Sequence, residues 1–269
     1  MRVIIESDPA AVARTAADFV ASLLARKPDA VLGLATGSTP LGLYSELIRR
    51  RQADGLDFSR ITTFNLDEYV GLPRDHEQSY HRFMHENLFQ GINISPDRVH
   101  IPDGLAADYD VWCAMYEELI HTCGGIDLQV LGIGVDGHIA FNEPGSSLGS
   151  RTRLKMLAPE TIRDNARFFG SVEAVPKLAV TMGVGTILES RRCLLLATGE
   201  KKAEAIAATI EGPVTAQVTA SALQLHRDVV AIVDEAAAAK LARREYYNEV
   251  ERMQRELEAR SRRPTPEQG

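Results

Sequence analysis

At residues 130–144 the sequence reads Val130-Leu-Gly-Ile-Gly-Val-Asp-Gly-His-Ile-Ala-Phe-Asn-Glu-Pro144. An apolar run rich in Val, Leu and Ile breaks here into a glycine-containing turn, a pattern typical of a buried strand in a parallel sheet and the loop at its carboxyl end. Because clefts form at that edge of such sheets, the loop predicts an acid/base cluster of Asp136, His138 and Glu143. Taken alone, an Asp-Gly-His turn also fits a polar loop without a catalytic role.

Apolar, β-branched runs alternate with helical patterns along the rest of the chain. We expect strands at 3–5, 31–35, 61–64, 128–133, 193–197 and 229–233, and helices at 10–25, 41–51, 201–210 and from 235 onward. This alternation predicts an α/β, Rossmann-like fold, in which helices cover both faces of a mostly parallel sheet. Without an internal repeat or linker, residues 1–250 are expected to form a single domain. Residues 251–269 would be a polar helical extension that ends in a disordered tail beyond Arg260.

The composition excludes several classes of protein. A net charge of −7 argues against nonspecific nucleic-acid binding, which needs a basic face. No apolar stretch approaches the length that spans a membrane, and no secretory signal precedes the first strand, so a cytoplasmic location is the default expectation. The three cysteines form no CxxC pair and are expected to be free thiols.

A second motif, Val31-Leu-Gly-Leu-Ala-Thr-Gly-Ser-Thr-Pro40, predicts a strand that runs through a glycine turn into a helix. Thr39 suits the N-cap and Pro40 the first helical position. Free N–H groups, the helix dipole and the hydroxyls at this point favour an anion, so we expect a phosphate cradle that includes Gly37 and Ser38. The motif matches neither the Walker pattern nor GxGxxG, so it does not indicate a nucleotide. A capped helix start without a ligand is the alternative.

The third motif is Ile61-Thr-Thr-Phe-Asn-Leu-Asp-Glu-Tyr69, a strand whose carboxyl end presents two carboxylates. On extended backbone Asp67 and Glu68 point to opposite sides, so one of them can face a shared cleft and act as a base. The alternative is a solvated acidic turn. Two cations, Arg167 and Lys202, could reach a phosphate, although solvation at the surface is the usual role of such residues.

Two patterns have simpler explanations than a cofactor. His81 and His85 lie four residues apart on a predicted helix, but neither His-Glu-x-x-His nor a third ligand is evident, so we expect no metal. The positions Trp112, Met115 and Leu119 are expected to form a core stripe.

Together these segments resemble the glucosamine-6-phosphate deaminase family, also called the glucosamine/galactosamine-6-phosphate isomerase family. The resemblance extends from the first strand to Asn248 and rests on four motifs in the family's order. They are Leu34-Ala-Thr-Gly-Ser-Thr-Pro40, Phe64-Asn-Leu-Asp-Glu-Tyr-Val-Gly-Leu-Pro73, Asp136-Gly-His-Ile-Ala-Phe-Asn-Glu-Pro144 and Ser150-Arg-Thr-Arg-Leu-Lys155.

The resemblance implies a cofactor-free reaction that converts glucosamine 6-phosphate and water to fructose 6-phosphate and ammonia, by ring opening, aldose-ketose isomerisation and loss of the amine. It implies that His138 opens the ring with help from Asp136 and Glu143, and that Asp67 moves a proton between C2 and C1. The expected phosphate ligands are Gly37, Ser38, Thr39, Arg167 and Lys202. The segment 156–172 would be a mobile lid.

The resemblance also implies a homo-oligomer, such as a hexamer. Some relatives are activated by N-acetylglucosamine 6-phosphate at a site between subunits, and four residues match its anion-binding positions: Ser146, Arg153, Lys155 and Tyr246. Met156 stands where the activated relatives have Thr and cannot donate a hydrogen bond, so activation is expected to be weak or absent.

Two other functions use a similar fold. A 6-phosphogluconolactonase would also bind a sugar phosphate, but the Asp67 motif and the full loop 136–144 favour the deaminase. A noncatalytic sugar-phosphate sensor of a transcription regulator would need a DNA-binding module, and the strand pattern starts at Arg2 with no helix-turn-helix before it.

Overall fold

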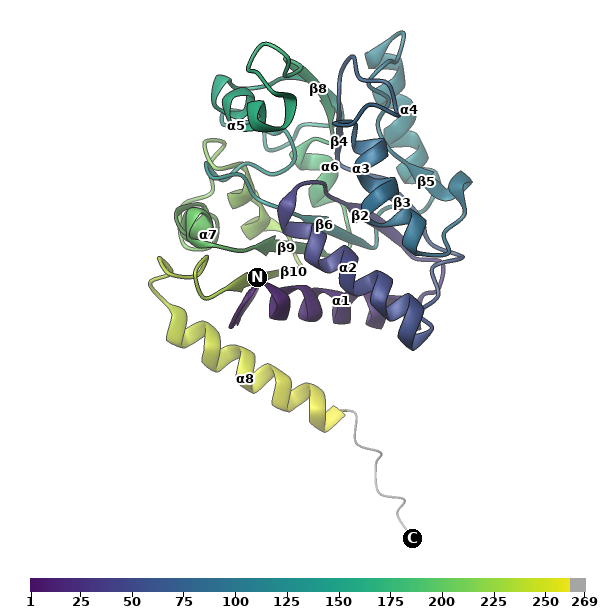
Figure 1. Cartoon of the computed structure of the whole chain (residues 1–269). Coiled ribbons are helices and arrows are strands. Elements are labelled where there is room, and N and C mark those ends of the chain that lie inside the picture. Colours follow the sequence, from purple (N-terminus) through teal and green to yellow (C-terminus); the bar gives the residue numbers. More distant parts are fainter. Residues whose placement is uncertain (262–269) are drawn as a thin grey trace.

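The main feature of the fold is a seven-stranded, all-parallel sheet in the order β1-β10-β9-β6-β2-β3-β5 (Figure 1). The structure is a computed structural model that describes residues 1–261. The strands of this sheet are β1 (Arg2–Glu6), β2 (Val31–Leu34), β3 (Thr62–Asn65), β5 (Val99–His100), β6 (Leu128–Leu131), β9 (Cys193–Ala197) and β10 (Val229–Asp234).

Helices cover both faces of the sheet, which confirms the predicted fold class. One face packs against α1 (Pro9–Arg26), α2 (Ser38–Asp54) and α3 (Tyr80–Asn87). The other face packs against α4 (Tyr109–Thr122), α6 (Val184–Leu188), α7 (Ala203–Ile210) and the 3-10 turn η4 (Thr219–Leu225). In β9, for example, Leu194 and Leu196 pack in the first layer and Leu195 in the second, as the pleat of a strand requires.

A second, three-stranded sheet has the order β4-β8-β7 and was not expected from the sequence. Its strands are β4 (Asp67–Tyr69), β8 (Leu178–Thr181) and β7 (Arg153–Met156), and both pairings are antiparallel. The helix α5 (Pro159–Phe169) connects β7 to β8. This sheet lies beyond the carboxyl edge of the large sheet, because β4 begins two residues after β3 ends.

Three local expectations are wrong. Helix α2 begins at Ser38 with Gly37 as N-cap, so Thr39 is not the N-cap; the positive φ of Gly37, 99°, lets the chain turn into the helix two residues earlier. No helix starts at Glu235, because Ala237 and Ala238 are buried in turns, and α8 runs instead over Arg244–Ser261.

The third wrong expectation is the predicted core stripe on α4. Met115 is 65% exposed, while Trp112 and Leu119 are partly buried. The buried residues of this helix are Cys113, Tyr116 and Ile120, which have the same helical spacing one position further along. Spacing alone does not distinguish the two stripes, and for that reason the pattern predicts the wrong one.

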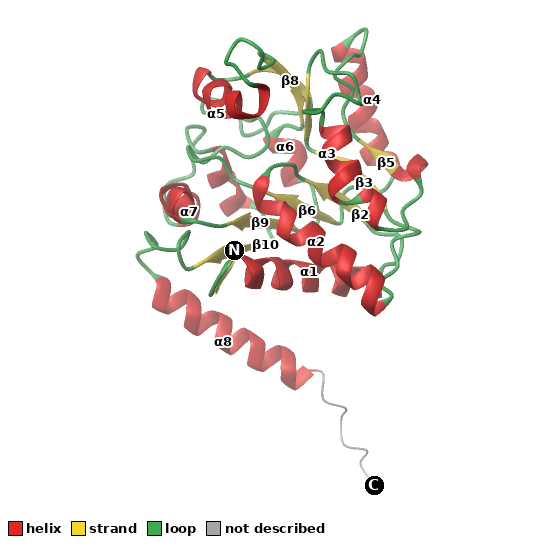
Figure 2. Cartoon of the chain, viewed as in Figure 1, coloured by secondary structure: helices red, strands yellow, loops and turns green. Residues whose placement is uncertain are grey.

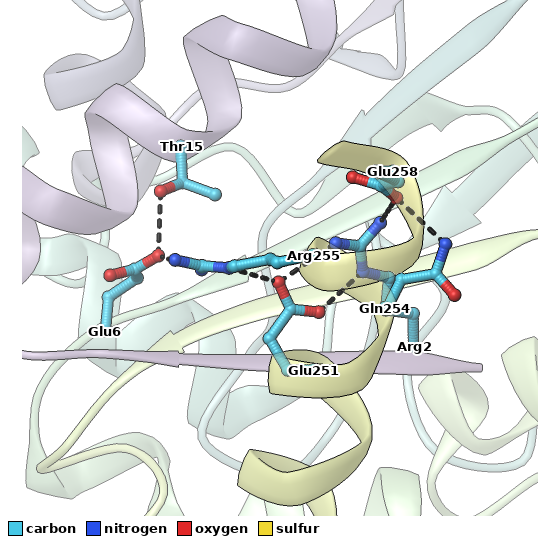
Figure 3. A network of polar contacts seen from close by, with 7 residues as sticks. All are labelled: Arg2, Glu6, Thr15, Glu251, Gln254, Arg255 and Glu258. Carbon is cyan, nitrogen blue, oxygen red and sulfur yellow. Dashed lines mark hydrogen bonds and ion pairs between the residues drawn. The ribbon is translucent and has the colours of Figure 1, made fainter. Parts of the chain in front are cut away.

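The last helix, α8, attaches to the first strand through a network of charged groups (Figure 3). Arg2 donates to both carboxylate oxygens of Glu251, at 2.7 and 2.9 Å, and to Glu258 at 2.8 Å. Arg255 donates to Glu251 at 2.6 Å and to Glu6 at 3.2 Å, and Glu6 also accepts from Thr15 of α1. The network therefore joins both ends of the described chain to the same edge of the sheet.

The helix α8 crosses residue 250 without a break, and the proposed boundary between residues 250 and 251 stays a prediction. The tail expected to be disordered, 262–269, lies outside the described residues. Figure 2 shows the helices of the chain in red. Within residues 1–261, none of them combines the length and the apolar character needed to cross a bilayer. Cys113, Cys123 and Cys193 are free thiols, as expected.

Candidate functional site

The motifs at 34–40, 64–73 and 136–144 follow β2, β3 and β6, which lie where the direction of the sheet order reverses. From β2 the chain continues outward through β3 to β5, while from β6 it continues through β9 to β10 in the opposite direction. In open α/β sheets the carboxyl ends of strands beside such a switch point are the usual place for a ligand. The segments after β2, β3, β6 and β9 contain all the predicted catalytic and phosphate-binding residues except Arg167, which lies on α5. These segments are neighbours, because the four strands are adjacent in the order β9-β6-β2-β3.

Asp67 is a buried carboxylate without a compensating partner. Its residue exposure is 5%, and no donor among the described residues hydrogen-bonds to its side chain. Burial, reinforced by the negative charge of Glu68, raises the pKa of Asp67 to about 8. Desolvation destabilises the charged form, so the ionised carboxylate is a stronger proton acceptor than an ordinary aspartate.

The neighbouring Glu68 has a structural role, because hydrogen-bond donors surround its carboxylate. Its carboxylate accepts hydrogen bonds from the Ser79 hydroxyl at 2.7 Å and from the backbone N–H groups of Tyr69 and Tyr80 at 2.8 and 2.9 Å. These contacts fix the start of α3 against β4. The adjacent carboxylates thus face different surroundings, as the alternation of an extended strand predicts.

His138 lies between two carboxylates. Its Nδ1 is 2.7 Å from Oδ1 of Asp136 and 3.6 Å from Oε2 of Glu143. Burial opposes the ionisation of Asp136, but the contacts with His138 outweigh it, so the pKa of Asp136 lies below its usual range. Both carboxylates face the same ring nitrogen, which leaves Nε2 as the nitrogen available for a substrate.

The same three side chains are the group of potential metal ligands within residues 1–261, with ligand atoms within 4.8 Å of one another. Both carboxylates approach Nδ1, where a proton on that nitrogen can be donated to them. A metal bound to Nδ1 would replace that proton, so the geometry favours an acid/base histidine. His81, predicted not to bind metal, has its Nε2 3.1 Å from the Pro102 carbonyl oxygen.

Thr181 and Met182, at the end of β8, connect the two acid/base centres. Asp67 pairs with Thr181 in the small sheet, and the Thr181 hydroxyl accepts a hydrogen bond from the N–H of Phe141 at 3.1 Å. The carbonyl of Met182 accepts from the side chain of Asn142 at 2.8 Å. The strand that carries Asp67 and the loop that carries His138 therefore share one support. A threonine in a strand has no pattern of its own, and sequence reasoning missed this residue.

The loop backbone has one unusual conformation at Ala140, whose φ is 51°. Alanine adopts a positive φ rarely, because its Cβ approaches the following carbonyl. The loop is held nearby by Thr219, which accepts from the N–H of Ile139 at 3.3 Å and donates to the Asn142 carbonyl at 2.8 Å. Contacts from a distant segment thus hold the turn between His138 and Glu143.

The predicted phosphate cradle at residues 37–39 presents uncapped donors. No side chain caps α2, so the first N–H groups of the helix have no hydrogen-bond acceptor from a capping residue. Gly37 and Ser38 are exposed, and Thr39 is half-buried. Open N–H groups at the positive end of a helix dipole suit an anion such as a phosphate.

Lys202 reaches from the other side of the switch point. Its ammonium donates to the carbonyl of Ile133, in the loop after β6, at 2.6 Å. Burial lowers the pKa of Lys202, and the charge of Arg167 adds to this effect, while Asp136 and Asp164 oppose it. Lys202 and Arg167 therefore lie within electrostatic reach of each other. Arg167 itself is exposed, on the last turn of α5.

The segment 156–172, predicted to be a lid, consists of the end of β7, the helix α5 and the turn after it. Glu143 joins it to the His138 loop, because its Oε1 accepts from the N–H of Ala158 at 3.0 Å. At the other end Phe169 packs edge-on against Tyr69, with 5.3 Å between ring centroids, and Tyr69 also contacts Phe141 at 5.4 Å. The mobility of this segment stays a prediction.

The residues predicted for the effector site do not meet within one chain. Arg153 and Lys155 lie on β7, and Arg153 donates to Asn142 at 3.0 Å. Ser146 is buried, and its hydroxyl has no hydrogen-bond partner among the described residues. Tyr246 lies on α8, at the opposite end of the molecule from α5 and β8 (Figure 1). A site that uses all four residues therefore requires a second chain.

With this geometry established, comparisons with known proteins identify similar chains. The family model for glucosamine-6-phosphate isomerases/6-phosphogluconolactonase matches residues 7–232. A glucosamine-6-phosphate deaminase of Cellvibrio japonicus is 55% identical over 257 residues, which are 96% of this chain and 98% of the relative. A glucosamine-6-phosphate deaminase of Shewanella loihica is 53% identical over 260 residues, 97% of each chain.

Among solved structures, a deaminase is also more similar to this chain than a lactonase is. The structure of a monomeric glucosamine-6-phosphate deaminase matches with a TM-score of 0.87 and 48% identity, over 89% of this chain and all (100%) of that one. A 6-phosphogluconolactonase from Thermotoga maritima matches with a TM-score of 0.68 and 23% identity, over 87% of this chain and 99% of that one, which shows a shared fold only.

Proposed function

The chain belongs to the family of glucosamine-6-phosphate isomerases and 6-phosphogluconolactonases, and on that premise we propose that it acts as a glucosamine-6-phosphate deaminase. The reaction converts glucosamine 6-phosphate and water to fructose 6-phosphate and ammonia. The observation that supports this most directly is that one sheet edge holds an unpaired buried carboxylate, Asp67, and a histidine between two carboxylates, His138. The reaction needs two separate proton transfers, and these two groups supply them.

Ring opening is the first transfer. Nε2 of His138 moves a proton between the anomeric hydroxyl and the ring oxygen of the pyranose, while Asp136 and Glu143 orient the imidazole and stabilise its charged form. The contact of Glu143 with Ala158 links this loop to the lid, so closing of α5 and positioning of the histidine are coupled.

Isomerisation is the second transfer. The carboxylate of Asp67 removes the proton at C2 of the open-chain sugar while the aldehyde oxygen at C1 takes up a proton, which gives an enolamine with a double bond between C1 and C2. Return of the proton from Asp67 to C1 then converts the enolamine to an iminium ion at C2. Water then adds at C2 and ammonia leaves. A single buried carboxylate suits a proton that moves between neighbouring carbons, because few solvent protons compete in such a pocket.

A direct assay distinguishes the candidate activities. We expect glucosamine 6-phosphate to yield ammonia and fructose 6-phosphate in equal amounts, and we expect no hydrolysis of 6-phosphogluconolactone above the spontaneous rate. Activity toward the lactone alone would contradict the proposal. The identities of 55% to a deaminase and 23% to a lactonase favour the first outcome.

Removal of either cation should weaken the binding of the phosphate. Lys202→Ala and Arg167→Ala are each expected to raise the dissociation constant of fructose 6-phosphate by about one to two decades, because a charge-assisted contact contributes roughly 1.5 to 3 kcal/mol. Isothermal titration measures the change. Unphosphorylated fructose is the control, and its weak affinity should not differ among the three proteins. Unchanged affinity for fructose 6-phosphate in both variants would show that the phosphate lies elsewhere.

The pH dependence follows from Asp67. The base must be ionised, and its pKa is about 8, so kcat/KM is expected to fall about tenfold for each pH unit below 8. Glu68→Gln removes the neighbouring negative charge and should move this acidic limb to lower pH. A profile that stays flat down to pH 6 in the wild-type enzyme would exclude Asp67 as the titrating base.

We also propose that the chain forms a homo-oligomer. Its regulatory anion site would consist of Ser146, Arg153 and Lys155 of one chain and the C-terminal helix of another. Activation by N-acetylglucosamine 6-phosphate is expected to be weak, because Met156, 70% exposed at the end of β7, cannot donate a hydrogen bond. Substrate saturation curves with and without effector test this. Met156→Thr should increase activation, and a strongly sigmoidal wild-type curve that the effector makes hyperbolic would contradict it.

A further inference from the structure

The protein has a cavity of about 790 Å³ in addition to the proposed sugar-phosphate site. Helices α3 and α4, the edge strand β5 and the segment before β5 form its walls. None of the residues assigned above to catalysis or phosphate binding lines it. Its volume is within the range of about 300 to 1,000 Å³ in which proteins bind small organic molecules.

One part of the cavity wall is apolar and aromatic. Trp112 and Leu119 of α4 line the cavity together with Phe89, Ile94 and the β5 residue Val99. These five side chains are only partly buried in the described structure, although they pack against the two core layers. The indole of Trp112 stacks on Tyr116, with 4.9 Å between ring centroids and an angle of 25°. A flat apolar molecule can therefore bury its faces against this wall.

The polar part of the cavity lining, which we call the rim, consists of hydrogen-bonding groups and includes two arginines. Arg74, Arg82, His81, His85 and His100 line it, against one acidic residue, Asp75. With the histidines neutral, the two arginines outnumber the one carboxylate of this lining, whereas acidic residues predominate in the whole chain, whose net charge is −7.

The arginines of the rim are only partly neutralised. Arg82 donates through Nε to Glu86 at 2.7 Å and through Nη1 to the carbonyl of Asp75 at 3.3 Å, which leaves its Nη2 without a partner among the described residues. Arg74 is 70% exposed and lies 3.9 Å from Asp103. Guanidinium groups with unused donors bind carboxylates, phosphates and sulfonates.

The histidines add donors that are not used elsewhere. No hydrogen bond of the His85 or His100 ring is present in residues 1–261, and the His100 ring packs on Phe64 at 4.8 Å between centroids. Burial lowers the pKa of His100, so at neutral pH its ring is uncharged and can donate one hydrogen bond and accept another. The same cavity lining therefore combines unused hydrogen-bonding groups with apolar side chains.

We propose that this cavity is a second binding site, which takes an organic anion with a flat apolar body. The body lies between Trp112, Leu119 and Phe89, and the anionic group lies at the rim beside Arg82 and His85. The site is separate from the sugar-phosphate site and binds a different chemical class, since a sugar phosphate lacks an extended apolar face.

The chain contains one tryptophan, Trp112, so its fluorescence reports directly on the cavity. The probe is anilinonaphthalene sulfonate, a flat aromatic anion, titrated against the intact protein. We expect saturable quenching of Trp112 with one probe bound per chain. The neutral analogue phenylnaphthylamine should bind at least about tenfold more weakly, because it lacks the charged group that contacts the rim.

Two charge reversals locate the anion. Arg82→Glu should weaken the probe by about tenfold or more, whereas the matched reversal Arg26→Glu, on an exposed position of α1, should leave its affinity unchanged. Circular dichroism and thermal unfolding of both variants show whether the fold is kept. If Arg82→Glu fails to fold, His85→Glu, which places a carboxylate at the same rim on an exposed side chain, serves in its place.

Four results would overturn the proposal. Competitive displacement of the probe by saturating fructose 6-phosphate would place it in the sugar-phosphate site. Equal affinity of the anionic and neutral probes, or of the Arg82→Glu and wild-type proteins, would remove the anion preference. Trp112 fluorescence that changes with protein concentration, without probe binding, would show that a second copy of the chain fills the cavity. Because the titration measures no turnover, its outcome is independent of the proposed deaminase activity.

Discussion

Asp67→Asn is expected to lower kcat by about a hundred- to ten-thousand-fold while the dissociation constant of fructose 6-phosphate stays close to that of the wild type. The asparagine keeps the size of the side chain but cannot accept the C2 proton. Exchange of solvent hydrogen into C1 of fructose 6-phosphate, followed by NMR in deuterated water, should disappear with turnover. Near-normal exchange in the variant would remove Asp67 from the proton transfer.

A stability measurement separates this variant from a merely damaged protein. The pKa of Asp67 is raised from 3.8 to about 8, so the folded state holds this proton more tightly than the unfolded state does, and the group's contribution to stability falls as the pH rises between these values. The asparagine that replaces it has no charge to desolvate. The variant should therefore gain Tm relative to the wild type at pH 8 and lose that advantage near pH 4.

Glu68→Gln is the matched control for a buried carboxylate in the same strand. The Glu68 carboxylate accepts hydrogen bonds from the Ser79 hydroxyl and from two backbone N–H groups. In the glutamine variant an amide NH₂ group replaces one of the accepting oxygens and cannot accept these bonds, so the variant should lose roughly 1 to 3 kcal/mol of stability. Its kcat should fall far less than that of Asp67→Asn. Equal catalytic losses in the two variants would indicate that disruption of β4, rather than loss of a base, explains both.

His138→Gln is expected to lower kcat/KM for glucosamine 6-phosphate by about a hundred- to ten-thousand-fold. Glutamine can donate a hydrogen bond to Asp136 or Glu143, but it cannot exchange a proton at neutral pH. Since the proposed role is ring opening, an open-chain substrate analogue should bind with nearly wild-type affinity, and steady-state kinetics beside calorimetric titration measures both effects.

His121→Gln, on an exposed position of α4, makes the same chemical change away from the site and should leave the kinetics unchanged. Equal losses of cyclic-substrate turnover and open-chain affinity in His138→Gln would contradict the assignment to ring opening.

Chelation of divalent metals should leave the wild-type rate unchanged, because His138 presents Nδ1 to carboxylates in the manner of an acid/base group.

Much of the large sheet could be predicted because its strands are buried on both faces. The run at 193–197 is apolar at every position, and β9 has the predicted limits Cys193–Ala197. The small sheet could not be predicted in the same way. Its strand β4 reads Asp-Glu-Tyr and β7 alternates basic with apolar residues, so neither has a continuous apolar run, and their pairing with β8 depends on segments far apart in the chain.

The acid/base residues could be predicted together where they are local in sequence. Asp136, His138 and Glu143 come from one loop, and the structure places His138 between the two carboxylates. Their support by Thr181 and Thr219 could not be foreseen, because one hydroxyl in a strand or turn gives no periodic signal. The helix start at Ser38 is missed for a similar reason, since both Gly37 and Thr39 are acceptable N-caps and the backbone torsion decides between them.

The pairing of β1 with β10 also sets the order in which the molecule can assemble. Arg2 pairs with Val230 and bonds to Glu251, so β1 leaves the ribosome more than 220 residues before its partners, as the numbering of these residues shows. At about 5 to 20 residues per second, β1 waits on the order of ten seconds or longer before β10 exists. Closing so long a loop is slow as well, because its entropy is lost before the contacts form. β1 therefore joins the sheet late, and until it pairs with β10, the edge of β10 that it covers is open to aggregation.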